Sequence, residues 1–226
     1  MKACKYLLGA MLGLSVTSAI AADLGSYKDG PQEFVVEDER GWMIRGRVVG
    51  VLPDESLSGF TIPGAAISVE DAVMPELDVT YFLSRNLALE LAFTATHHDI
   101  DGRGALGPAG EVGDIWMAPA TLMLQYHLDA WHGVKPYVGA GVNYTFFFNE
   151  DAGPAFTSLD LDDSFGFALQ AGVDIPLRDN WYLNFDVKKI WMDTDASVSG
   201  GVATGNVELD PWVVGVGLGY RFPSWR

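Results

Sequence analysis

A strict alternation of side chains in the stretch WMIRGRVVGVL, residues 42–52, decides the fold. Its even positions, from Trp42 to Leu52, are apolar or glycine, whereas its odd positions include Arg45 and Arg47. Successive side chains of a β-strand point to opposite faces of the sheet. The period of two therefore predicts a strand with one apolar face and one face that holds charges.

The same alternation recurs in seven further stretches, which are residues 73–83, 87–96, 115–128, 134–148, 165–177, 181–192 and 212–222. Short turns are expected at 84–86, 129–133 and 178–180, and long acidic loops at 53–72, 97–113, 149–163 and 193–207. This layout predicts an all-β fold, an eight-stranded antiparallel transmembrane β-barrel over residues 41–222. Because the strand number is even, we expect both chain ends on the short-turn side, the periplasm of a Gram-negative cell.

A soluble β-sandwich or lipocalin-like barrel is the alternative fold, and the charges argue against it. A soluble barrel buries its apolar face and shows polar residues outside. Here charges of both signs share the mixed face, where they can pair inside a narrow barrel. Aromatic residues gather near the strand ends, as in the girdles of outer-membrane barrels; they include Trp42, Tyr81, Tyr126, Trp181 and Tyr220 at one end and Trp116, Phe146, Phe148, Trp191 and Trp212 at the other.

The first 21 residues are typical of a secretory signal peptide. Lys2 and Lys5 precede an apolar run, and the motif Ala19-Ile20-Ala21 predicts cleavage after residue 21 or 22. Residues 22–40 then form an N-terminal periplasmic segment, and residues 223–226 form a C-terminal extension. The single cysteine, Cys4, leaves with the signal, so no disulfide or thiol chemistry is expected in the mature chain.

The composition excludes nucleic acid as a partner. The chain has 30 acidic residues against 14 Lys and Arg, a net charge of −16, whereas phosphate binding needs clustered cations. With 49% hydrophobic residues and 26 glycines, the chain is expected to be neither disordered nor a helical bundle. The mature part has no apolar run of 18 residues, so no transmembrane helix is expected.

The lumen-facing side chains fall into two groups by height. The lower group is a polar plug of charged residues, accompanied by Gln125, Asn143 and Gln170; the charged residues are Arg45, Arg47, Glu76, Asp78, Glu90, Asp186 and Lys188. The upper group is an apolar vestibule of Val49, Val51, Met74, Met117, Phe147, Ile190 and Met192. An apolar vestibule above a polar floor suits a hydrophobic ligand that enters from outside. Alternatively, these apolar side chains only fill a narrow barrel.

Four stretches resemble the OmpW family of small outer-membrane proteins. They are residues 119–126 (PATLMLQY), 135–147 (KPYVGAGVNYTFF), 161–172 (LDDSFGFALQAG), and 209–213 (LDPWV) with its continuation to GYRF at 219–222. The similarity covers nearly all of the mature chain, and the family includes the AlkL-type alkane importers. It implies an eight-stranded barrel that helps small hydrophobic molecules across the outer membrane. The chain departs from the family in continuing beyond the terminal aromatic residue, Phe222.

Pro119 is expected to face the lumen in the middle of the fourth predicted strand. Proline removes a hydrogen bond from the ladder, and a closed barrel has no edge that could accommodate the loss. We therefore expect a weak lateral seam between the strands of residues 87–96 and 115–128. The resemblance implies lateral release of substrates there, since Pro119 matches the family's proline. The alternative is a local bulge that only shapes the barrel.

Other residue patterns predict no enzyme, metal site or cofactor. His97-His98-Asp99 begins a predicted loop, but no Ser or third partner is fixed by spacing. Consecutive residues of a strand point to opposite faces, so the two histidines cannot share a metal. Residues 99–102 and 160–163 lack the full pattern of a calcium loop. We expect these acids to be solvated, or to hold divalent ions that bridge to lipopolysaccharide.

Two functions therefore stay open. The first is passive passage of small hydrophobic molecules through the vestibule, with lateral release at Pro119. The second is a structural or interaction barrel whose acidic loops contact lipopolysaccharide, phage, bacteriocin or a host surface. The expected partners are outer-membrane lipid, lipopolysaccharide and small hydrophobic molecules. No strand carries a polar seam that predicts an oligomer, so the oligomeric state stays open and a monomer is favoured.

Overall fold

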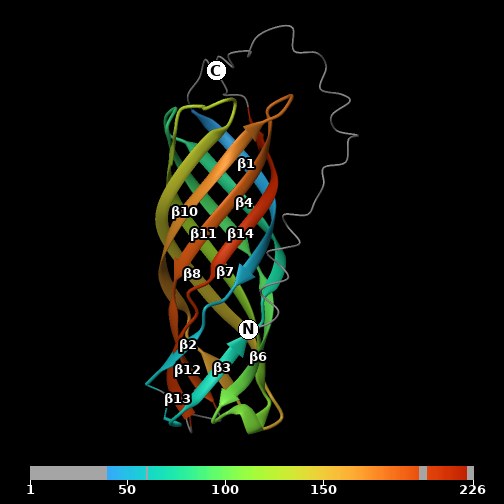
Figure 1. Ribbon diagram of the computed structural model, residues 1–226, viewed down its shortest axis with the longest axis vertical. Coiled ribbons are helices and arrows are strands. Elements are labelled where there is room, and N and C mark those ends of the chain that lie inside the picture. Colours follow the sequence, from blue (N-terminus) through green and yellow to red (C-terminus); the bar gives the residue numbers. More distant parts are fainter. Residues whose placement is uncertain (1–39, 60, 199–202, 223–226) are drawn as a thin grey trace. The chain divides into compact units, whose positions relative to one another are not determined.

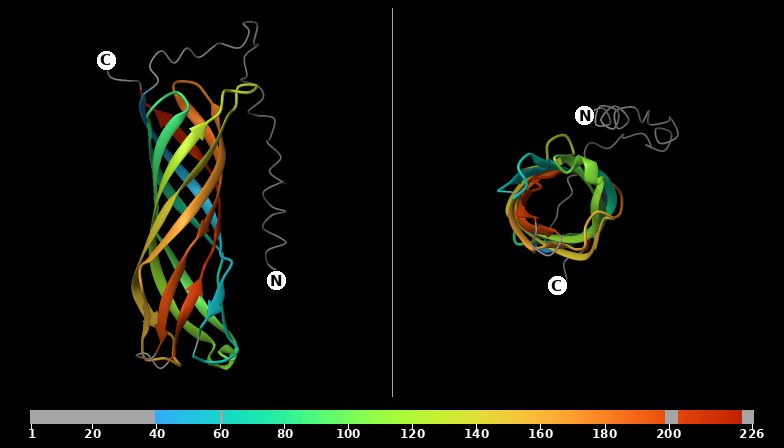
Figure 2. Two further views of the ribbon diagram at one scale, coloured as in Figure 1. Left: turned by 90° about the vertical axis from the view of Figure 1, so that its left-hand side faces the viewer. Right: turned by 90° about the horizontal axis from the view of Figure 1, so that it is seen from below.

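Eight antiparallel strands close into a barrel in the computed structural model, which describes residues 40–59, 61–198 and 203–222 (Figures 1 and 2). Around the ring the order is β7-β5-β4-β1-β14-β11-β10-β8, and the β7–β8 ladder closes it. The bounds are β1 (Gly41–Leu52), β4 (Ala72–Phe82), β5 (Leu87–Thr94), β7 (Glu111–His127), β8 (Lys135–Ala152), β10 (Ser164–Pro176), β11 (Trp181–Trp191) and β14 (Trp212–Arg221). The predicted eight-stranded barrel is thus confirmed.

The two predicted terminal segments lie outside the described residues. These are the signal peptide with most of the periplasmic segment, residues 1–39, and the extension at 223–226. Within the described residues, no helix is long and apolar enough to cross a membrane.

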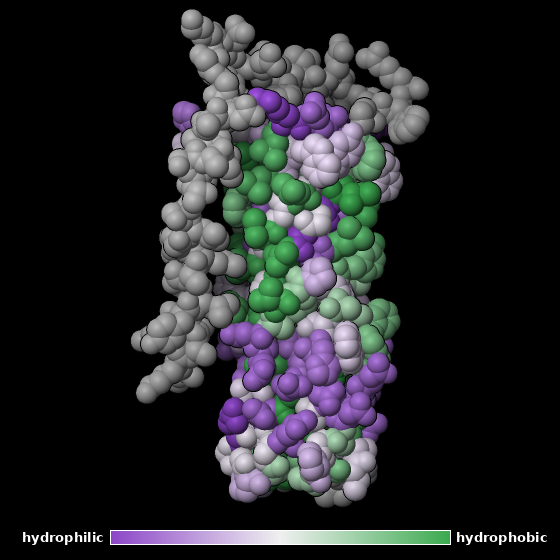
Figure 3. Space-filling view, turned by 90° about the vertical axis from the view of Figure 1, so that its right-hand side faces the viewer, coloured by the Kyte–Doolittle hydropathy of each residue, from purple (hydrophilic) through white to green (hydrophobic). Residues whose placement is uncertain are grey.

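The alternation along each strand sorts side chains between the lumen and the outer surface. In β1, Arg45 and Arg47 are buried in the lumen, whereas Ile44 and Val48 are exposed on the outside. The outward side chains of the eight strands form an apolar band around the barrel (Figure 3). Such a band suits the interior of a bilayer, because lipid offers no hydrogen-bond partner for polar side chains. The backbone groups of the strands are already paired with one another in the closed barrel.

Short turns join the strands at one end of the barrel, as predicted. In the turn between β10 and β11, Asp179 and Asn180 have φ of 56° and 66°, and the Leu177 N–H donates to the Trp181 carbonyl at 2.8 Å. Asp and Asn adopt positive φ more readily than most residues, and hairpins of this kind require it. Both described chain ends lie at this end of the barrel, where the Phe222 N–H donates to the Trp42 carbonyl at 2.8 Å.

The four predicted long loops are wrong in extent, because strands that continue the barrel wall occupy a large part of each of them. The added strands are β2 (Ser56–Ser58), β3 (Ala65–Val69), β6 (Thr96–Gly104), β9 (Leu159–Leu161), β12 (Asp193–Val198) and β13 (Ala203–Glu208), with a short 3-10 helix η1 (Gly107–Ala109). Strands β3 and β6 join β7, and β2-β13-β12-β9 form a second sheet. We call these six strands, with residues 111–115 and 149–152 of β7 and β8, the barrel extension.

The polarity of the two faces is inverted in the barrel extension, although the inside–outside alternation of the side chains continues unbroken from β11 into β12. In β12, Thr194, Ala196 and Val198 are buried inside, while Asp193 and Asp195 face outward. Apolar residues inside and acids outside are the pattern of a barrel in water. Figure 3 shows the result as a hydrophilic zone beyond the apolar band. The prediction failed because it looked for strands with an apolar outer face.

Candidate functional site

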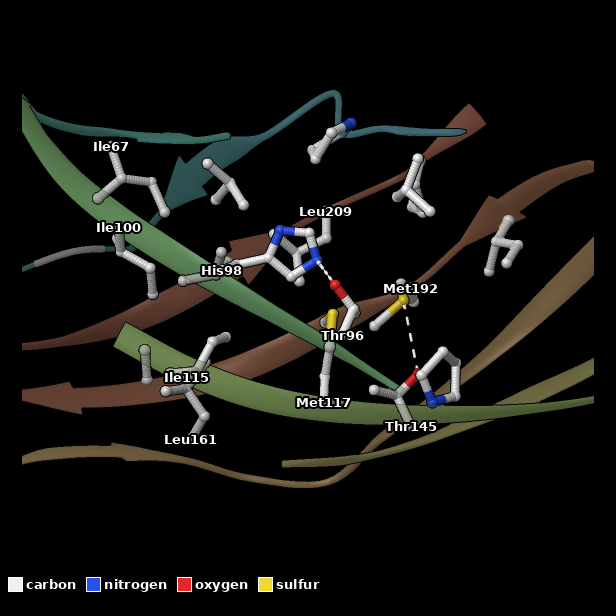
Figure 4. A pocket seen from close by; sticks show the side chains of 18 of the residues that line it. Ile67, Thr96, His98, Ile100, Ile115, Met117, Thr145, Leu161, Met192 and Leu209 are labelled. Carbon is white, nitrogen blue, oxygen red and sulfur yellow. Dashed lines mark hydrogen bonds between the residues drawn. The ribbon is translucent and has the colours of Figure 1, made fainter. Parts of the chain in front are cut away.

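The barrel extension encloses an apolar cavity at the end opposite the short turns (Figure 4). The cavity has a volume of about 90 Å³ and is partly open to solvent. Its wall includes Ile67, Ile100, Ile115, Leu161, Met192 and Leu209. We keep the name vestibule for this cavity. Its apolar wall suits the hydrophobic part of a small ligand.

The residues predicted for the vestibule lie in or around this cavity. Val51, Met74, Met117, Ile190 and Met192 line it. Val49 and Phe147 belong to the buried apolar cluster that surrounds it. Sequence reasoning missed the outer part of the wall, which comes from β3, β6, β9, β12 and β13. The alternation in these segments was the available signal, with apolar side chains on the inner rather than the outer face.

A layer of charged side chains fills the lumen on the short-turn side of the vestibule. Arg45 lies 3.2 Å from Asp78, 3.0 Å from Glu90 and 2.8 Å from Asp174. Arg47 lies 2.9 Å from Glu76, 2.8 Å from Asp78, 3.2 Å from Glu90 and 3.4 Å from Asp186. These are side-chain nitrogen to carboxylate oxygen distances, and all seven side chains are buried. We call this set, with Lys188, the ionic layer.

The ionic layer contains every charged residue that was predicted for the polar plug, and one more. Asp174 was not among the residues predicted for the plug, yet its carboxylate contacts Arg45. Gln125 and Gln170 bridge the carboxylates, since both donate to Glu90 at 2.9 Å. At the vestibule side of the layer, the Lys188 ammonium donates to Glu76 at 2.6 Å. Because the layer is dense and paired, an apolar molecule in the vestibule meets a charged floor.

Aromatic side chains close the lumen at the short-turn end. Phe82 and Tyr182 are buried with Met43 and Ala88. The His127 ring lies 5.0 Å from the rings of both Phe82 and Tyr137. The described lumen therefore has three levels: the vestibule, the ionic layer and this aromatic level.

The hydrogen-bonded wall is interrupted beside Pro119. Across β8, Pro119 is in register with Thr145. On its other side, the β5–β7 ladder ends at the Phe93–Ala120 pair and the β6–β7 ladder begins at the Thr96–Met117 pair. Among the described registers, Pro119 therefore has no partner in β5 or β6. Sequence reasoning anticipated an interruption at this proline and missed a second proline, Pro75.

Pro75 lies where the pairing of β4 with β5 ends. The β4–β5 ladder ends at the Glu76–Thr94 pair, and the Thr94 hydroxyl donates to the Pro75 carbonyl at 2.8 Å. The outer surface is hollowed here, and the hollow is lined by Gly46, Val48, Pro75, Leu77, Phe93 and Ala95, among others. Glu76 and Thr94 line both this hollow and the vestibule. Only a thin part of the wall thus separates the vestibule from the lipid-facing surface.

His98 lies in the vestibule wall, although it was predicted to begin a loop. It belongs to β6 and points inward, whereas His97 points outward and contacts Asp114 at 2.8 Å. The opposite directions of the two histidines agree with the prediction that they cannot share a metal. Burial lowers the pKa of the His98 imidazole below its usual value, although a contact between its Nδ1 and the Glu70 carbonyl at 3.2 Å acts in the opposite direction.

Lowering the pH is expected to destabilise the barrel through His98. Below about pH 6.5 the unfolded chain takes up a proton at this imidazole, while the folded barrel resists doing so. The unfolded state then binds more protons, so the free energy of unfolding falls as the pH falls. Urea unfolding of the wild type and His98→Phe at about pH 7.5 and pH 5 measures this loss, which should be smaller in the variant. His132→Phe, at an exposed turn residue, is the control. Equal losses in all three proteins would contradict the prediction.

Comparisons with known proteins agree with this architecture. The model of the OmpW family matches residues 39–222. An uncharacterized outer-membrane protein, y4mB of Sinorhizobium fredii, is 40% identical over 223 residues, which cover 97% of this chain and 96% of that protein. Outer membrane protein AlkL of Ectopseudomonas oleovorans is 33% identical over 76% of this chain and 75% of its own length. The dibenzothiophene metabolism operon protein PahQ of Pseudomonas aeruginosa is 32% identical over 82% of this chain and 90% of its own length.

Solved structures show the same barrel. The crystal structure of outer membrane protein OprG from Pseudomonas aeruginosa superposes with a TM-score of 0.76 at 32% sequence identity. The match covers 82% of this chain and 98% of that chain.

Proposed function

This chain belongs to the OmpW family of outer-membrane proteins, and from this premise we propose that it gives small hydrophobic molecules passive passage across the outer membrane. The vestibule is the observation that carries the proposal. It is an apolar cavity, partly open to solvent at one end of the barrel and floored by the ionic layer. The transfer of a hydrophobic molecule from water into such a cavity is favourable, because it removes apolar surface from water. The relative named for dibenzothiophene metabolism supports an apolar substrate.

The proposed path turns sideways at the ionic layer. A molecule without polar groups cannot replace the ion pairs of Arg45 and Arg47, so continuing along the axis would leave buried charges unpaired. The wall offers the alternative at two places: the outer hollow adjoins it beside Pro75, and on the far side of β5 the ladder is interrupted beside Pro119, which lines the vestibule. In our proposal the molecule enters the vestibule from the extracellular side and leaves sideways into the bilayer through this seam. The short-turn end then faces the periplasm.

Pro119→Ala is expected to reduce hydrophobic uptake while the barrel still assembles. Alanine supplies the N–H that proline lacks and can restore a ladder hydrogen bond beside the seam. Uptake of a labelled long-chain alkane by whole cells measures the effect at matched outer-membrane levels. Pro176→Ala, at the end of β10 near a short turn, is the matched control. Unchanged uptake by Pro119→Ala would show that the proline only shapes the barrel.

The acidic outer face of the barrel extension favours a second function, contact with lipopolysaccharide or another surface partner. Asp160, Asp162 and Asp195 surround a hollow on this face. Carboxylates could reach lipopolysaccharide phosphates through bridging divalent ions. Whole-cell uptake separates the two functions: a barrel that accelerates uptake of no hydrophobic molecule would act through this face instead.

A further inference from the structure

The inner part of the vestibule carries polar side chains that the apolar wall does not explain. Thr96, His98, Thr121 and Thr145 are buried, and all four line the cavity. Figure 4 shows Thr96, His98 and Thr145 among the side chains that surround the pocket. A cavity meant only for hydrocarbon would gain nothing from hydroxyl groups, because a buried polar group without a partner is unfavourable.

The hydrogen bonds of His98 are already used within the protein. Its Nδ1 faces the Glu70 carbonyl at 3.2 Å, and a carbonyl only accepts, so Nδ1 carries the proton. In the neutral imidazole, Nε2 is then an acceptor, and the Thr96 hydroxyl at 3.1 Å donates to it. Both ring nitrogens and the Thr96 proton are thus occupied. This pair offers a ligand no donor.

Thr121 and Thr145 differ from the Thr96–His98 pair in that the side-chain amide of Asn143 is hydrogen-bonded to both of them. The Asn143 Nδ2 donates to the Thr121 hydroxyl oxygen at 2.9 Å, and the Thr145 hydroxyl donates to the Asn143 Oδ1 at 2.8 Å. The Thr121 proton has no acceptor among the described residues, and the Thr145 oxygen accepts from none of them. Side by side, the cavity therefore presents one free donor and one free acceptor.

Charge complementarity excludes ionic ligands from this position. The charged residues that line the vestibule within the described chain are Glu76 and Lys188, and they pair with each other at 2.6 Å. A carboxylate ligand would find no free cation, and an ammonium ligand no free anion. A single hydroxyl, which both accepts and donates, matches Thr121 and Thr145 together.

We propose that the vestibule binds apolar molecules that end in one hydroxyl group, such as primary alkanols, and that Thr121 and Thr145 hold this hydroxyl. The inference rests on the proposed function and names a substrate class for it. The Thr121 hydroxyl donates to the ligand oxygen, and the ligand hydroxyl donates to the Thr145 oxygen. The hydrocarbon part lies against the apolar wall, where Met74, Met117 and Met192 adapt to its shape.

Methyl NMR of the methionines, with the barrel in lipid nanodiscs, tests this assignment. Met192 is a direct reporter, because its sulfur lies 3.8 Å from the Thr145 hydroxyl. Three probes are titrated: 1-octanol, the acceptor-only ketone 2-octanone, and octane. Thr121→Val should weaken binding of both 1-octanol and 2-octanone roughly tenfold, since each loses its donor. Thr145→Val should weaken 1-octanol alone. Thr204→Val, at a residue of the outer acidic hollow and outside the vestibule, should change none of the three affinities.

Octane provides the internal control, because it makes no hydrogen bond. Its affinity should be equal in the wild type and all three variants. If 1-octanol binds equally well to all four proteins, or if octane binding falls in parallel, the hydroxyl site is wrong. If octane shifts no methionine methyl in the wild type, the proposed function itself fails, which is a different result.

Discussion

Arg45→Met is expected to lower the free energy of unfolding of the barrel by about 3–5 kcal/mol, the usual range when one partner of a buried ion pair is removed. Arg45 contacts Asp78, Glu90 and Asp174, and all of these groups are buried in the lumen. Methionine fills part of the volume but leaves the three carboxylates without their shared cation. Urea unfolding in lipid vesicles, followed by tryptophan fluorescence, measures the loss.

Two further variants separate charge from geometry in this test. Arg45→Lys restores the charge but not the guanidinium fork, so an intermediate stability is expected. Arg103→Ala removes an exposed arginine that lies 3.4 Å from Asp101, and surface pairs of this kind contribute at most about 1 kcal/mol. If Arg45→Met were no less stable than Arg103→Ala, the ionic layer would not hold the barrel together.

Met74→Trp is expected to reduce hydrophobic uptake roughly tenfold or more. Met74 is 5% exposed and lines the vestibule, so the larger indole ring occupies space that the ligand needs. Overpacking of this kind costs about 1–3 kcal/mol, which corresponds to a factor of about 5 to 150 if the bound ligand bears the cost. The measurement is uptake of a labelled alkane at matched outer-membrane levels.

Val73→Trp is the matched control for Met74→Trp. It adds the same ring at the neighbouring residue of β4, but Val73 is 67% exposed on the outer face. Uptake by this variant should equal that of the wild type. Equal loss in both variants would indicate a defect in assembly, and equal activity in both would mean that the substrate does not pass Met74.

The membrane part of the fold could be predicted because lipid imposes a simple pattern on it. Outside positions such as Val48 and Leu77 must be apolar, so the alternation marks both the strand and its faces. The same alternation predicted that Arg45 and Glu76 both face the lumen. It could not show that Asp174 joins Arg45, because that contact links strands 129 positions apart in the sequence.

The barrel extension could not be found by the same rule, because it is surrounded by water. Its outer positions, such as Asp193 and Asp195, are acidic, and its inner positions, such as Ala196 and Val198, are apolar. Gly, Pro and Ser in these segments also suggested loops. The inversion has a functional consequence, because the inward apolar residues of the extension form the outer wall of the vestibule. The outer wall of the vestibule was therefore the part of the site that could not be predicted from the sequence.

The function of Thr121 and Thr145 was also beyond sequence reasoning. Their free hydrogen-bonding capacity depends on how Asn143 orients its amide, which the alternation along a strand does not show. Such an arrangement is set by register across β7 and β8, which places Thr121 opposite Asn143.

Whole-cell uptake of a labelled long-chain alkane, with and without this protein, tests the central claim most directly. A small hydrophilic solute measured in the same cells reports on leakage of the outer membrane. We predict faster uptake of the alkane when the protein is present, with no gain for the hydrophilic solute. Equal alkane uptake in the two strains at confirmed outer-membrane expression would contradict the claim that the vestibule passes hydrophobic molecules.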